Sequence, residues 1–114
     1  MSAVGELLDT AEALMTRTSA DSWGRWPRAS ALLIRQSIET AIDRLDPALA
    51  GVRNARARLM ALRAVLSDDQ PLADDVDYAY GALSRMIHHH AYELPPTAVE
   101  LQQMIAIARR LAVR

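Results

Sequence analysis

Apolar residues recur every three or four positions in five separate stretches of the chain, which is the spacing of helices that bury one face. The stretches lie at about residues 3–20, 27–45, 51–66, 72–91 and 98–112. No stretch alternates apolar and polar residues as a half-buried strand does. The pattern therefore predicts an all-α fold.

Residues that favour helix ends stand at several of these boundaries. Ser2 can cap the first helix, and Pro27 suits the first position of the second. Thr97 and Glu100 have the spacing of a capping box at the start of the last helix. With short connections and no internal repeat, we expect residues 1–114 to form a single domain, an up-and-down bundle of about five helices.

The second stretch is apolar on more than one side, because Leu32 and Leu33 flank the main apolar stripe. A helix that buries several faces lies inside a bundle, so we expect this one to be central. Asp46-Pro47 should end it.

Composition narrows the chemistry that the chain can perform. With no cysteine, it has no disulfide framework, zinc-thiolate site or thiol nucleophile. All 13 basic residues are arginines, but the formal net charge is −1, so any contact with RNA must depend on local arginines. No apolar run approaches the roughly 20 residues that cross a bilayer, and the N-terminus carries acids where a signal peptide would be basic. We therefore expect a soluble, cytoplasmic protein without membrane contact.

The chain's three histidines, His88, His89 and His90, stand side by side a few residues after Arg85. Arginine supplies a fixed cation, and imidazole transfers protons near neutral pH. This segment is therefore the candidate for chemistry.

A helical wheel places Arg85 opposite the apolar stripe of the fourth helix, with Tyr78, His89 and Tyr92 within about 40° of it and Gly81 on the same side. Tyrosine and arginine are enriched at interfaces, and glycine lets a second backbone approach closely. The face could thus meet another molecule. Alternatively, Tyr78 and Tyr92 could cover a neighbouring helix of the same chain.

The run from Arg85 to His90 resembles the Arg-x4-6-His motif of HEPN (higher eukaryotes and prokaryotes nucleotide-binding) domains. The following segment, residues 92–101, is similar to the one after the motif in small actinobacterial-type members. The Leu-Ile-Arg-Gln-x-x-Glu-Thr run at 33–40 also resembles helix two of such proteins.

This resemblance implies a metal-independent endoribonuclease without a cofactor, acting as a homodimer whose two motif helices meet across a two-fold axis. Arg85 would clamp the scissile phosphate, and His90 would be the general acid or base. A straight helix puts His89 beside Arg85 and His90 about 140° away, so both imidazoles are candidates, together with His88.

A catalytically silent HEPN-like module is the alternative, binding RNA or a protein partner such as an antitoxin. Active members usually carry a polar residue after the arginine, and Met86 takes that place here. Glu39, four residues after Arg35, could lie in the cleft or form a plain surface ion pair.

We expect no metal site, because adjacent histidines on a helix diverge and the segment lacks a pair of ligands four residues apart. We expect the arginines of the third helix to form a solvated face. These are Arg53, Arg56, Arg58 and Arg63.

Overall fold

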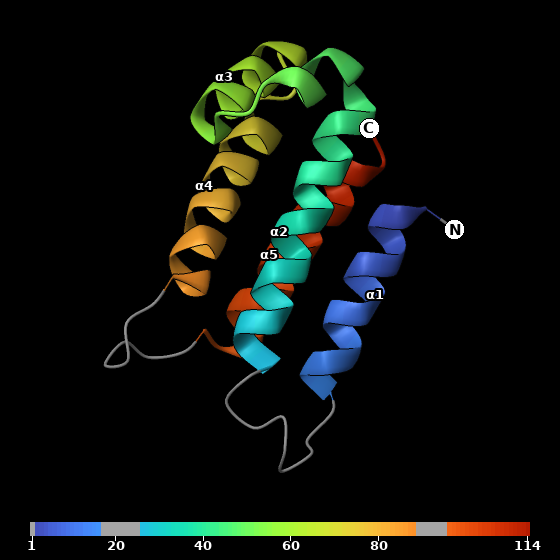
Figure 1. The fold of residues 1–114 in the computed structure, drawn as a ribbon, viewed down its shortest axis with the longest axis vertical. Coiled ribbons are helices and arrows are strands. Elements are labelled where there is room, and N and C mark those ends of the chain that lie inside the picture. Colours follow the sequence, from blue (N-terminus) through green and yellow to red (C-terminus); the bar gives the residue numbers. More distant parts are fainter. Residues whose placement is uncertain (1, 17–25, 89–95) are drawn as a thin grey trace.

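Five α-helices and one short 3-10 helix make up residues 2–16, 26–88 and 96–114, the part of the chain that the computed structural model describes (Figure 1). The elements are α1 (Ala3–Thr16), α2 (Trp26–Leu45), the 3-10 helix η1 (Pro47–Gly51), α3 (Ala55–Val65), α4 (Gln70–Ile87) and α5 (Ala98–Ala112). These residues contain no strand, so the predicted all-α fold is confirmed. Within the same residues, no helix combines the length and the apolar character needed to cross a membrane.

Four long helices run alternately up and down, as predicted for a bundle with short connections (Figure 1). In Figure 1 α1 descends, α2 rises, α4 descends and α5 rises, while α3 packs across the upper end of the bundle. The N-terminal end of α1 and the C-terminal end of α5 consequently lie toward the same end.

The central position predicted for the second helix is confirmed, because α2 packs against α1, α4, α5 and η1. Its Ile34 and Ile38 are fully buried. Two serines, Ser30 and Ser37, are also fully buried, and each satisfies its hydroxyl on a backbone carbonyl. The Ser30 hydroxyl donates to the carbonyl of Ala11 at 3.3 Å and so links α2 to α1.

Two predicted helix starts are confirmed in detail. The backbone N–H of Gly5 donates to the Ser2 hydroxyl at 3.0 Å, which satisfies a free donor of the first turn of α1. At the start of α5, the Thr97 hydroxyl accepts from the Glu100 N–H, and the Glu100 carboxylate accepts from the Thr97 N–H. This is the predicted capping box.

The predicted third helix, 51–66, is wrong at its start. Asp46 caps η1 by accepting from the Ala48 N–H, and α3 begins only at Ala55, after Asn54 accepts from the Ala57 N–H. Both side chains are strong N-caps, so each starts its own element. Arg53 therefore lies before α3 rather than on it.

The described part of the first helix lies within the predicted range of 3–20. The helix α1 covers Ala3–Thr16, and the Thr16 hydroxyl donates to the carbonyl of Ala13 at 3.0 Å. Residues 17–20 of the predicted helix lie outside the described residues.

Candidate functional site

One side of α4 carries the predicted interface residues, of which Tyr78 and Arg85 are exposed and Gly81 is half-buried. The Tyr78 side chain is 61% exposed, so the alternative that it covers a neighbouring helix of this chain is wrong. These three residues are three or four apart and thus share a face. We call this the Arg85 face.

The glycine lets the arginine lie close to the helix. A helical side chain points toward the N-terminus of its helix, so Arg85 extends over position 81. A Cβ atom built on Gly81 would lie 3.5 Å from Nη1 of Arg85, which is ordinary van der Waals contact. Alanine would therefore fit at this position, whereas a larger side chain would displace the guanidinium.

Most arginines of the described residues form ion pairs with carboxylates. The pairs are Arg35 with Glu39, Arg58 with Asp43, Arg63 with Asp74 and Asp77, Arg109 with Asp9 and Glu12, Arg110 with Asp75, and Arg114 with Asp68. Arg85 makes no such pair within the ranges described, so its charge is available to an anionic ligand there.

The predicted extension of the fourth helix to about residue 91 is wrong, because α4 ends at Ile87 and His88 is its C-cap. A guanidinium N–H of Arg28, on α2, donates to the Ile87 carbonyl at 2.7 Å. This contact satisfies one of the free carbonyls at the end of α4 with a cation, which is the favourable charge for a helix C-terminus.

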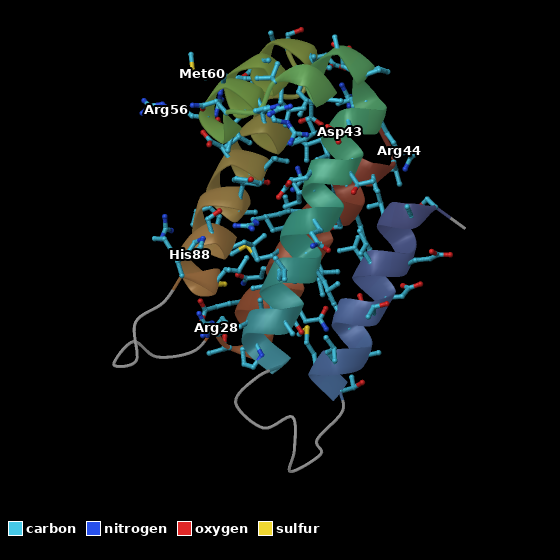
Figure 2. All side chains as sticks on the ribbon, in the orientation of Figure 1. Arg28, Asp43, Arg44, Arg56, Met60 and His88 are labelled. Atoms are coloured by element: carbon cyan, nitrogen blue, oxygen red, sulfur yellow. The ribbon has the colours of Figure 1, made fainter. Side chains whose placement is uncertain are left out.

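The helical wheel used to place the histidines consequently does not apply beyond Ile87, where α4 ends. His88 is exposed at the end of α4, and Figure 2 shows it on this end of the helix. His89, His90 and Tyr92 lie outside the described residues. Among the described residues, no three potential metal ligands come together.

Glu39, on α2, contacts a different side of α4 from the side that carries Arg85. The Tyr80 hydroxyl is 3.4 Å from Oε1 of Glu39, between α4 and α2. Tyr80 and Arg85 are five residues apart, so their side chains leave the helix about 140° from each other. The structure therefore places Glu39 with Tyr80, away from the Arg85 face.

The predicted pair of Arg35 and Glu39 forms, with Nε 3.4 Å from Oε1, and both side chains are half-buried rather than at the surface. Arg58 of α3 adds a second cation, because it donates to the Glu39 carbonyl at 3.2 Å and pairs with Asp43. The expectation that Arg58 is solvated is thus wrong. Its side chain is only 15% exposed, since it reaches from α3 to the Glu39 carbonyl and the Asp43 carboxylate of α2.

Burial raises the pKa of the Tyr80 phenol above its ordinary value, and the Glu39 carboxylate raises it further, whereas Arg35 and Arg58 oppose the shift. The unfolded chain therefore ionises Tyr80 before the folded chain does. The protonated Tyr80 phenol therefore contributes to the free energy of unfolding. This contribution is fully present below the ordinary tyrosine pKa of about 10 and is lost as the pH rises above it.

Tyr80→Phe should therefore show a smaller loss of unfolding free energy between neutral and strongly alkaline pH than the unsubstituted protein. Glu39→Gln should lie between the two, because it removes only the second cause of the raised pKa. Urea denaturation at a series of pH values measures this. If the unfolding free energies of the unsubstituted protein and Tyr80→Phe fell in parallel with pH, Tyr80 would not be the group responsible for the loss.

Comparison with known proteins gives no relative: no family model matches the chain, and no curated protein or solved structure matches it. The candidate site therefore rests on the geometry of α4 and on the residues that follow it.

Proposed function

We propose that the chain is a metal-independent endoribonuclease that acts as a homodimer through the Arg85 face. The observation that carries this proposal is the position of Arg85, exposed on α4 beside Gly81 and outside the ion pairs that hold most other described arginines. The resemblance of the Arg85 to His90 run to the HEPN motif supports the same proposal.

The reaction needs only groups of the protein. The 2′-oxygen of the RNA attacks the adjacent phosphorus while an imidazole takes the 2′-hydroxyl proton. The bond to the 5′-oxygen breaks, and an imidazolium gives that oxygen a proton, leaving a 2′,3′-cyclic phosphate and a 5′-hydroxyl. Arg85 stabilises the charge on the non-bridging oxygens. His90 is the first candidate for proton transfer, with His89 and His88 as the others.

A homodimer gives this reaction two copies of each group. In a two-fold dimer the same face meets itself, so two Arg85 side chains and two histidine segments would border one cleft. Gly81 would allow the two helices to approach, and Tyr78 would supply contact area.

A catalytically silent module that binds RNA or a partner protein is the second candidate. The observation that favours it is the position of Met86, which is half-buried and packs against the core of the bundle. Position 86 therefore contributes no polar side chain beside Arg85.

Incubation of purified protein with labelled RNA in the presence of EDTA tests the proposal, because the mechanism uses no metal. We expect cleavage with cyclic-phosphate ends, alongside an Arg85→Ala control without activity. Binding of RNA or of a partner without cleavage would favour the silent module, and Met86→Asn would then be tested for restored activity.

Gly81→Arg should break the proposed dimer, because a long charged side chain would stand where the two helices approach and would repel Arg85. Sedimentation at micromolar concentration should show a dimer for the unsubstituted protein and a monomer for this variant. The variant should stay folded, since arginine favours a helix over glycine by up to about 1 kcal/mol.

Gly51→Arg is the matched control for this experiment. Gly51 is exposed at the end of η1, and a Cβ there meets no atom within 4 Å. This variant should remain dimeric. A monomer for the unsubstituted protein would argue against the dimer, as would equal effects of the two substitutions.

A further inference from the structure

A second surface, separate from the Arg85 face, forms a groove between α3 and α4, and Tyr80 of α4 lines it. Its empty space is about 1100 Å³, counted with the solvent that enters it, and its walls include Leu59, Met60, Tyr80, Arg56 and Asp77. We call it the α3–α4 groove. A smaller hollow of about 170 Å³, also counted with the solvent that enters it, shares Leu59 and Tyr80 with the groove and is lined by Glu39 as well.

The groove is rich in the side chains that bind other proteins. Met60 is 67% exposed although it is large and apolar, and methionine adapts its shape to a partner. Leu59 and Tyr80 are half-buried beside it and continue the apolar surface inward. Aromatic residues, methionine and arginine are enriched at protein interfaces.

The charges of the groove select the chemistry of the occupant. Arg63 is neutralised by Asp74 and Asp77, at 2.5 and 3.2 Å. Arg56 is exposed and makes no ion pair within the described residues, and Figure 2 shows it on the same side of α3 as Met60. One unmatched cation thus lies beside an apolar surface.

We propose that the α3–α4 groove binds an acidic segment of a partner protein, in which a bulky apolar side chain lies next to a carboxylate. The apolar side chain would pack on Met60 and Leu59, and the carboxylate would pair with Arg56. RNA fits less well, because holding a phosphate backbone takes several cations, whereas Arg56 is the one arginine of the groove lining that makes no ion pair within the described residues. This site does not depend on whether the protein cleaves RNA.

Selection from a random peptide library displayed on phage, with the whole protein as bait, tests the proposal. The enriched peptides should combine an acidic residue with a neighbouring large apolar one. A synthetic copy of the best peptide should bind the protein in a fluorescence anisotropy titration. Its affinity should fall about tenfold or more when its acidic residue is changed to the amide.

Substitutions in the groove locate the binding. Met60→Glu and Arg56→Glu should each lower the affinity for the peptide about tenfold or more, because the first removes the apolar contact and the second reverses the charge. Two matched controls should bind it normally. Val99→Glu changes a side chain of α5 that is 68% exposed, and Arg44→Glu changes an exposed arginine of α2 on another side of the molecule (Figure 2).

All four substituted side chains are exposed, so circular dichroism should show that these variants stay folded. Arg85→Ala should also bind the peptide normally, which separates this site from the proposed nuclease. Enrichment of basic peptides would overturn the proposal. So would equal binding by the groove and control variants, or displacement of the peptide by single-stranded RNA.

Discussion

Replacing Arg85 by alanine is expected to abolish cleavage of RNA, because the substitution removes the cation that stabilises charge on the phosphate oxygens. Arg85→Lys should also be poor, since an ammonium group cannot reproduce the planar two-donor geometry of guanidinium. The rate with labelled RNA in EDTA measures both effects. His90→Ala should lower the rate by a factor on the order of 10²–10⁴ if that imidazole transfers the proton, with His89→Ala milder.

The matched control is Arg44→Ala, because Arg44 is exposed and, like Arg85, makes no ion pair in the described ranges. Arg44→Ala should cleave at the full rate. An equal loss of cleavage rate in both variants would mean that Arg85 acts only through its contribution to the net charge of the protein, not at the phosphate. Full activity in an Arg85→Ala, His90→Ala double variant would assign the cleavage to a contaminant.

Ile38→Ala should lower the free energy of unfolding by about 2–5 kcal/mol, because it deletes buried methyl groups and leaves a cavity in the middle of the central helix. Ile38 is 0% exposed and lies on α2. A domain of this kind is stable by only about 5–15 kcal/mol, so the loss is a large part of the total. Urea denaturation followed by circular dichroism measures it.

Leu32→Ala on the same helix is the control, because the Leu32 side chain is 38% exposed and its removal leaves no closed cavity. It should cost less than about 1 kcal/mol. Similar losses of unfolding free energy in Ile38→Ala and Leu32→Ala would show that α2 is not the centre of the core.

Helix positions and several helix starts were predictable because they depend on neighbouring residues. The repeat of apolar positions marks each buried face, and Ser2, Thr97 and Glu100 satisfy backbone groups only a few residues away. Such contacts form within one turn and need no partner from elsewhere in the fold. The third helix was predicted to begin too early although its cap is local, because the apolar spacing starts at Val52 and runs on through the cap residue Asn54.

The exposed side of α4 was also predictable, since Tyr78, Gly81 and Arg85 follow from helical spacing alone. The end of α4 was not. Its last turn is contacted by Arg28, which lies 59 residues earlier in the chain and reaches the Ile87 carbonyl only once α2 packs beside α4. No local pattern encodes that contact.

Short-range spacing along the chain was enough to predict that this protein is helical, to place most of its helices and to put Arg85 on one face with Tyr78 and Gly81. Which charges are neutralised depends instead on how the helices pack against one another. Glu39 meets Tyr80 across 41 positions of the chain, and the Arg58 side chain of α3 is largely buried against Asp43 of α2, while Arg56 stays exposed. Such pairings join residues far apart in the chain, so the packing of the helices selects them.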